Sequence, residues 1–218
     1  MRQFCHFLKN LFLDFLYPPF CCGCDQLGSY LCARCFSQTH FFAQAVSLKL
    51  EPNYLDQLLS ACHYQFPIDR LIKEMKYQGV IELARLGGQL LYQTVDLPRI
   101  DLITAVPLHS KRLNERGFNQ AEVMAQELSF RLKVPYQPLL LRTVNTPHQA
   151  AITQRSLRLE QLQSCFSLNP VCNEQLPGKS ILLIDDVTTT GTTLNECARV
   201  LKDHSVSRVI GFTLAHGS

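Results

Sequence analysis

The segment from Ile181 to Leu194 constrains the fold most, because it combines in order a run of aliphatic residues, an acidic pair, a loop and a helical pattern. The four aliphatic residues predict a strand covered on both faces, as in parallel sheets. Asp185 and Asp186 follow at the carboxyl end of that strand, where open α/β sheets place their ligands. The segment therefore predicts an α/β protein with a ligand site at one sheet edge.

The loop from Thr188 to Thr193 has the composition of an anion site. Unpaired backbone amides at a helix N-terminus bind phosphate, threonine hydroxyls add donors, and Gly191 permits a positive φ. Two neighbouring acids repel a bare phosphate, so the ligand must also carry hydroxyl groups or a divalent cation. A sugar phosphate meets both demands. The alternative is a strand that ends in a solvated turn before a capped helix, without a ligand. A Walker loop is excluded, because no Gly-Lys-Ser/Thr sequence closes the segment.

The rest of the chain alternates apolar strands with amphipathic helices, which predicts a parallel sheet flanked by helices. Strands are expected over 58–66, 101–107, 136–141, 181–184 and 208–214, and helices over 3–17, 67–79, 80–91, 121–128 and after 191. A polar, basic loop is expected over 108–120, and a mobile loop or weak helix over 143–161. No stretch of 18 apolar residues occurs, so we expect no transmembrane helix.

The overall charge and the N-terminal sequence indicate which partners and which targeting segments to expect. The 218 residues carry 21 basic and 18 acidic side chains, so overall charge does not indicate a nucleic-acid partner, although a local basic patch stays open. The apolar N-terminal stretch contains Lys9 and Asp14 and lacks a small-residue cleavage site, so we expect no signal peptide. Its helical pattern favours packing on the protein or a partner, with a membrane-surface helix as the alternative.

Four cysteines have the spacing of a zinc site, with two Cys-x2-Cys pairs separated by seven residues. They are Cys21, Cys24, Cys32 and Cys35. Two such pairs present four sulfurs to one tetrahedral Zn²⁺, and a closed site of this kind is structural. Cys22 could compete as a ligand, and disulfides or free thiols are the alternatives. The other cysteines are scattered in apolar surroundings, which indicates a reducing compartment, and we expect a cytoplasmic protein.

A basic cluster follows the strand that ends at Pro107. It consists of His109, Lys111, Arg112 and Arg116, and we expect it at the same sheet edge as Asp185. Arginine binds phosphate oxygens in pairs, whereas lysine and histidine offer single donors. These cations suit the diphosphate of a sugar diphosphate. On charge alone, an ordinary basic turn before a helix is an equal alternative.

The segment from Ile181 to Leu194 resembles the 5-phosphoribosyl-1-pyrophosphate (PRPP) motif of type I phosphoribosyltransferases. The resemblance implies that the acidic pair contacts the ribose 2′ and 3′ hydroxyls, and that the threonine and glycine loop holds the 5′-phosphate. The PRPP-binding residues that it implies are Asp185, Asp186, Val187, Thr188, Thr189, Thr190, Gly191 and Thr192. The two acids are also the implied catalytic residues.

Four further motifs resemble, in their order, the ComF family, which includes ComFC and the GntX-like proteins. They are Leu16-Tyr-Pro-Pro19 before the cysteine pairs, Lys76-Tyr77-x-Gly79, Val106-Pro-Leu-His109 and Arg112-x3-Arg116-Gly-Phe-Asn-Gln-Ala121. With the PRPP motif, the resemblance covers nearly the whole chain. It implies an N-terminal helix and four-cysteine zinc element over 1–50, followed by a type I phosphoribosyltransferase-like α/β domain over 51–218.

The same resemblance assigns two loops beside the acidic pair. Pro107 to Lys111 is the implied pyrophosphate loop, and it adds Leu108, His109, Ser110, Lys111 and Arg112 to the PRPP-binding residues. Residues 143–161 are the implied flexible loop that closes over the site. Thr146-Pro-His-Gln149 fits the family pattern there, but Arg158 falls one residue late. Gln161 or Glu160 replaces an asparagine, so no catalytic role is assigned within this loop.

For function, the resemblance implies natural transformation, the handling of incoming single-stranded DNA beside a ComFA-like helicase and DNA-loading proteins. One hypothesis is a phosphoribosyltransferase that uses Mg²⁺ with PRPP, whose acceptor nothing in the sequence identifies. The other is a non-catalytic adaptor that uses the PRPP site as a ligand sensor or as a DNA phosphate site. Its candidate DNA contacts are Arg112, Arg116, Arg155 and Arg158. A third reading, an interaction module with a vestigial site, conflicts with the intact acidic pair.

Overall fold

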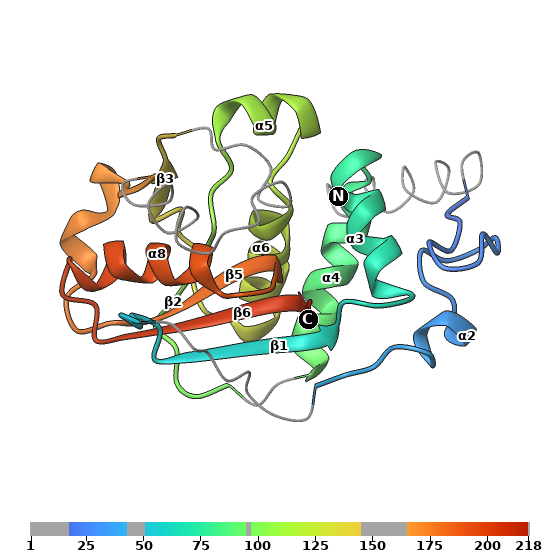
Figure 1. The fold of residues 1–218 in the computed structure, drawn as a ribbon, viewed down its shortest axis with the longest axis horizontal. Coiled ribbons are helices and arrows are strands. Elements are labelled where there is room, and N and C mark those ends of the chain that lie inside the picture. The colour runs from blue at the N-terminus through green and yellow to red at the C-terminus, as the bar shows by residue number, and fades with distance from the viewer. Residues whose placement is uncertain (1–17, 43–50, 95–96, 145–164, 218) are drawn as a thin grey trace, which may run out of the picture.

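The computed structural model describes residues 18–42, 51–94, 97–144 and 165–217. Its centre is a parallel sheet of four strands in the order β1-β6-β5-β2. These strands are β1 (Gln57–His63), β2 (Leu102–Ala105), β5 (Ser180–Thr188) and β6 (Arg208–His216). Every neighbouring pair is parallel, so all four carboxyl ends lie at one edge of the sheet, as Figure 1 shows. The predicted α/β fold class is confirmed.

Alternating side chains of β5 enter two hydrophobic cores, one on each face of the sheet. Leu182 and Ile184 pack in the core beneath three helices, whereas Ile181 and Leu183 pack in the other core. The three helices are α3 (Ile68–Tyr77), α4 (Ile81–Thr94) and α6 (Gln120–Leu132). Helix α8 (Thr192–Lys202) and the antiparallel pair β3 (Leu140–Arg142) and β4 (Phe166–Leu168) cover the opposite face. The aliphatic run therefore sits in the most protected part of the molecule.

Three local predictions were wrong. Residues 110–116 form helix α5 (Ser110–Arg116) where a loop was expected, and none of its residues is buried. His109 begins this helix by accepting a hydrogen bond from the Lys111 amide, and Gly117 at φ 79° ends it. The strand expected over 136–141 is reduced to a bridge between Tyr136 and Ile103 before β3 begins. Likewise β1 ends at His63, short of the expected residue 66.

Residues 18–42 lie along the side of the sheet domain and end against its edge strand (Figure 1). They contain one short helix, α2 (Ala33–Phe36). The Phe42 amide donates to the Ala61 carbonyl and the His63 amide to the His40 carbonyl, which adds an antiparallel segment beside β1. Edge strands expose unpaired backbone groups, and this pairing covers part of that edge.

Some expectations lie outside the described residues: the helix over 3–17, all but the first two residues of the closing loop over 143–161, and the contacts of Arg155 and Arg158. A 3-10 helix, η2 (Pro170–Gln175), follows β4 and was not expected. Within the described ranges, no helix combines the length and apolar character needed to cross a bilayer.

Helices α4 and α6 approach closely because α4 has two adjacent glycines. A methyl group on Gly88 meets the Glu127 Cβ at 2.7 Å and the Met124 carbonyl oxygen at 2.9 Å. We expect Gly88→Ala to lower the free energy of unfolding by about 1–3 kcal/mol, because this overlap outweighs the gain of about 0.4–1 kcal/mol that alanine brings to a helix. Urea denaturation measures the difference. Arg85→Ala, on the exposed side of α4, is the control, and an unchanged or more stable Gly88→Ala variant contradicts the packing account.

Candidate functional site

A cavity of about 600 Å³ opens at the carboxyl edge of the sheet. Its walls come from the end of β5, the loop into α8, the end of α3, helix α5 and the end of β3. The acidic pair, the threonine loop and several basic side chains all line it. The structure thus brings together groups that are far apart in the sequence, as the parallel arrangement predicted.

The two acids at the end of β5 have different partners. Asp186 is 7% exposed, and its Oδ2 forms an ion pair with Lys76 Nζ of α3 at 3.0 Å. Asp185 accepts a hydrogen bond from the Asp186 amide at 2.8 Å. Burial, followed by repulsion from Asp186, raises the pKa of Asp185 to about 7, although that amide, Lys76 and Arg142 act in the opposite direction. Desolvated acids held close together cost stability and are typical of binding sites.

The threonine loop begins helix α8 without a side-chain cap, because Gly191 occupies the N-cap position at φ 77°. The Gly191 amide donates to Thr188 Oγ1 at 3.1 Å, and the Thr190 and Thr192 hydroxyls lie 2.7 Å apart. These contacts hold the loop against the first turn of an eleven-residue helix. Backbone amides and hydroxyls at this position offer a binding site for a phosphate.

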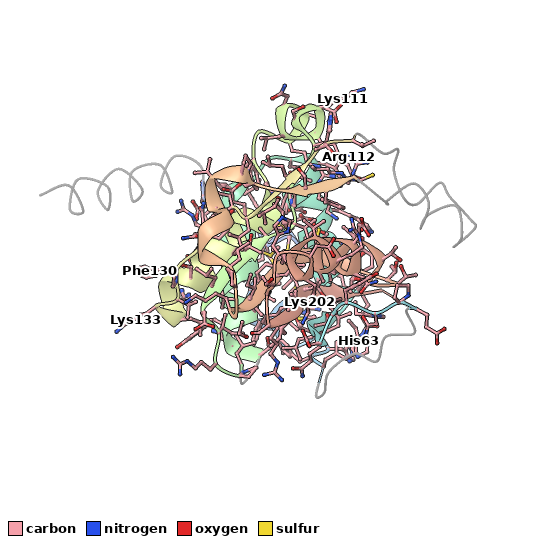
Figure 2. The ribbon with its side chains drawn as sticks, turned by 90° about the vertical axis from the view of Figure 1, so that its left-hand side faces the viewer. His63, Lys111, Arg112, Phe130, Lys133 and Lys202 are labelled. Carbon is pink, nitrogen blue, oxygen red and sulfur yellow. The ribbon has the colours of Figure 1, made fainter. Side chains whose placement is uncertain are left out.

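The basic wall of the cavity differs from the expected one. Of the five residues assigned to the pyrophosphate loop, Leu108 and Arg112 line the cavity, whereas His109, Ser110 and Lys111 do not. His109 is occupied as the N-cap of α5. Lys111 is exposed at the outer end of α5, with Arg112 nearer the body of the protein (Figure 2). The helix that replaced the expected loop is the physical reason for this difference.

Arg142, which sequence reasoning missed, completes the basic wall together with Arg112 and Arg116. Burial lowers the pKa of Arg112, and the neighbouring charges of Arg142 and Arg116 lower it further. Arg142 packs against the Phe166 ring, with 5.3 Å from its guanidinium carbon to the ring centre. A signal did exist, because Arg142 follows an expected strand in the same way as the other site residues. Three neighbouring arginines in one cavity favour a ligand with several negative charges.

The motif Arg116-Gly-Phe-Asn-Gln120 holds the walls together. Asn119 Nδ2 donates to the Val106 carbonyl at the end of β2, and its Oδ1 caps α6. Gln120 Nε2 donates to the Met75 carbonyl of α3 at 3.3 Å, and its Oε1 accepts from Arg116 Nη1 at 3.1 Å. These bonds connect the basic wall with the helix that carries Lys76. Most of this motif is therefore scaffolding for the site.

The cysteine cluster lies apart from the cavity. The sulfurs of Cys21, Cys24, Cys32 and Cys35 lie within 4.8 Å of one another, and they could hold a metal ion such as zinc. Burial alone raises the pKa of Cys21, but backbone amides, chiefly that of Cys32, outweigh it and lower the value to about 6. All the described cysteines are free of disulfides. The sulfurs are thus close together, and one of them is already stabilised as the thiolate that metals bind.

Cys22 points away from this cluster. It is 2% exposed and packs in the core with α3, where burial raises its pKa to about 12. Its sulfur is not among the four that lie within 4.8 Å of one another, so Cys22 does not belong to the cluster. Next to it, Gly23 allows the chain to pass Cys35, since a methyl group there meets the sulfur at 2.6 Å. Arg70 Nη1 of α3 donates to the Gly23 carbonyl and fixes the element to the domain.

Comparisons with known proteins show the family of this chain. A family model described as phosphoribosyl transferase domain matches residues 116–217. Competence protein F of Haemophilus influenzae is 33% identical over 210 residues, which cover 89% of each chain. The chain belongs to the ComF family of phosphoribosyltransferase-like proteins. Another relative of this ComF protein is DNA utilization protein YhgH of Escherichia coli, 29% identical over 87% of this chain and 85% of that one. The adenine phosphoribosyltransferase of Leishmania tarentolae has a TM-score of 0.41 and 11% identity, over 79% of this chain and 95% of that one.

We expect the ComF protein to bind one Zn²⁺ per chain through the four clustered sulfurs. Cys35→Ser should lose the metal and unfold residues 18–42, because a structural zinc site supplies the folding energy of a small element. Metal analysis of protein purified without chelator measures the content. Cys172→Ser, outside the cluster, is the matched control. Metal retention in Cys21→Ser together with metal loss in Cys22→Ala contradicts the assignment.

The raised pKa of Asp185 predicts a pH-dependent cost to the fold. Its folded-state value, about 7, exceeds the ordinary value of 3.8, so the stability due to the protonated form is present below about pH 4 and is lost as pH rises through 7. Asparagine does not ionise, so Asp185→Asn keeps this stability as pH rises. We expect the variant to be about 1–3 kcal/mol more stable than the parent at pH 8, with the difference vanishing near pH 4.

Urea denaturation at the two pH values measures this effect. Asp203→Asn, a change at a side chain that is 54% exposed, is the control and should alter stability little at either pH. If Asp185→Asn lowers the free energy of unfolding equally at both pH values, the fold does not raise the pKa of the Asp185 carboxyl, and the prediction is wrong.

Proposed function

We propose that this ComF protein binds PRPP with Mg²⁺ and acts in natural transformation, in the handling of incoming single-stranded DNA. One observation carries the proposal: a single cavity combines an acidic pair, a helix N-terminus with hydroxyls and a wall of arginines. The names of two relatives, a competence protein and a DNA utilization protein, support the process. The proposed location is the cytoplasm.

The charges of the cavity match the parts of PRPP. Asp185 and Asp186 take the ribose hydroxyls and the bound Mg²⁺, which offset their mutual repulsion. The 5′-phosphate lies over the segment from Val187 to Thr192, where amides and hydroxyls are available. The pyrophosphate lies against Leu108 and Arg112. His109, Ser110 and Lys111 complete this loop in the proposal, although their side chains do not reach the cavity.

If the protein is a transferase, the reaction is displacement of pyrophosphate from ribose C1 by a nucleophile. The ribose gains positive charge as the C1–O bond breaks, and the two carboxylates lie where they stabilise that charge. Arg112 and Arg116 stabilise the negative charge that develops on the leaving pyrophosphate. Mg²⁺, if held beside Asp185 and Asp186, would supply further charge neutralisation. The protein contributes mainly positioning and electrostatics.

A second candidate is a non-catalytic adaptor in which PRPP binding changes the affinity for DNA or a partner. The arginine wall favours it, because Arg112 and Arg116 line the cavity from a helix without buried residues. Arg155 and Arg158 join them in the proposal. Contacts of this kind bind phosphates without sequence preference and weaken with salt. The proposed partners are a ComFA-like helicase and DNA-loading proteins. The proposed domains are the N-terminal helix and zinc element over 1–50 and the phosphoribosyltransferase-like domain over 51–218.

Calorimetric titration of PRPP with Mg²⁺ tests the proposed site. We expect Asp185→Ala and Asp186→Ala each to weaken binding about tenfold or more, because hydrogen bonds to charged groups are worth about 1.5–3 kcal/mol. Asp203→Ala, outside the cavity, should bind as the parent does. Equal affinity in the parent and both cavity variants contradicts the assignment of the acids.

Pyrophosphate release then separates the two candidates. Release with a nucleobase, nucleoside or DNA acceptor, lost in the two Asp variants, identifies a transferase. Absence of release identifies the sensor if PRPP changes DNA affinity and DNA changes PRPP affinity by the same factor, since coupled binding is reciprocal. Absence of both effects rules out both candidates.

A further inference from the structure

A row of residues crosses the carboxyl edge of the sheet and ends at the threonine loop. His216 of β6 is the register partner of His63 in β1 on one side and of Thr188 in β5 on the other. Register partners in neighbouring strands point to the same face of a sheet, so their side chains are neighbours. His63 is exposed at the end of β1 (Figure 2). Thr188 lines the cavity, whereas His63 and His216 do not.

Three aromatic rings pack together in this row. The Phe42 ring stacks on the His63 ring, with 3.9 Å between the ring centres and 20° between the planes. The same ring meets the His216 ring edge to face, with 6.0 Å between the centres and 79° between the planes. Both are favoured arrangements of aromatic rings. Because Phe42 belongs to the segment that pairs with β1, these contacts continue from residues 18–42 into the sheet.

The end of β6 contacts the beginning of the threonine loop. The Gly217 amide donates to the Thr188 carbonyl at 2.8 Å, and a methyl group on Gly217 would meet Thr189 Cγ2 at 3.2 Å. Burial, followed by the charge of His63, lowers the pKa of His216, whereas a hydrogen bond to the Thr189 backbone raises it. The loop is therefore contacted by the His216 ring and by the residue that follows it.

The threonine loop is a segment that gains from such support. Thr189 and Thr190 are both exposed. An exposed loop loses conformational freedom when it binds a ligand, and this ordering costs free energy. A loop that is already held in its bound shape avoids part of that cost and binds more tightly. Contacts that fix Thr188 and Thr189 should therefore favour a phosphate bound on the loop.

We propose that His216 is a positioning residue for the threonine loop, and that the rings of Phe42 and His63 hold His216 in place. The inference rests on the proposed ribose phosphate site and adds residues outside the cavity lining that preorganise it. It gives residues 18–42 a part in ligand binding, on the side of the 5′-phosphate. The proposed pyrophosphate contact, Arg112, belongs to α5 and should not depend on these rings.

Calorimetric titrations with ribose 5-phosphate and with magnesium pyrophosphate test the positioning role. His216→Ala should bind ribose 5-phosphate about 2- to 12-fold more weakly than the parent, the loss expected for one net hydrogen bond. Its affinity for magnesium pyrophosphate should stay the same. His216→Gln, which keeps an N–H donor, should restore part of the loss.

The matched control is His204→Ala. His204 follows α8, outside the cavity lining, and its ring bonds to the Val200 carbonyl at 2.8 Å. This variant should bind both ligands as the parent does. An equal loss of affinity for both ligands in His216→Ala indicates general damage to the fold and contradicts the positioning role.

A double-mutant cycle tests whether the rings act through His216. Phe42→Ala and His63→Ala should each weaken the binding of ribose 5-phosphate about 2- to 12-fold, the contribution of one aromatic contact. Combined with His216→Ala, Phe42→Ala should cause no further loss, because the ring through which it acts is already missing. Phe130→Ala, at an exposed phenylalanine outside the cavity lining, is the control. Losses that add in the double variant show independent effects and contradict the inference.

The outcomes separate this inference from the proposed function. If the parent binds neither ribose 5-phosphate nor PRPP, the proposed function fails. If the parent and His216→Ala bind ribose 5-phosphate equally well, the assignment of His216 alone is wrong. The double-mutant cycle uses ribose 5-phosphate only, so it decides even if free pyrophosphate binds too weakly to measure.

Discussion

The repulsion between Asp185 and Asp186 is the constraint on which the site depends. The two carboxylates are held together because β5 lies in the middle of the sheet, where pairing with β2 and β6 fixes its backbone. Lys76 offsets one charge, while burial and the neighbouring acid raise the pKa of Asp185 to about 7. Strongly perturbed acids of this kind are typical of functional sites, and the proposed ligand, with its hydroxyl groups and a cation, would offset the repulsion.

Helix α3 connects the two functional parts of the chain. Its first half carries Arg70, which donates to Gly23 inside the cysteine element, and its last turn carries Lys76 and Tyr77 at the cavity. Cys22 packs in the same core as this helix. A metal held by these four sulfurs would therefore support the helix that forms one wall of the cavity.

The sequence predicted the parts of the fold that depend on burial. The aliphatic run of β5 and the apolar face of α8 carry strong periodic signals, and the acids and threonines between them fall at the expected edge. Helix α5 was missed because none of its residues is buried, so it carries no apolar period. Arg142 was missed although it follows the strand expected over 136–141, because no neighbouring charge or motif marks it in the sequence; in the structure it ends the three-residue strand β3. Lys76 was recognised only as part of a motif, since its ion pair joins residues that are distant in sequence.

The central claim is that one cavity divides a ribose phosphate between an acidic pair and a helix N-terminus. A crystal structure of the protein with PRPP and Mg²⁺ tests it most directly. The account predicts ribose hydroxyls within hydrogen-bonding distance of Asp185 and Asp186, with the 5′-phosphate over the threonine loop and the first turn of α8. A ligand bound with its 5′-phosphate against Arg112, or bound outside the cavity, contradicts it.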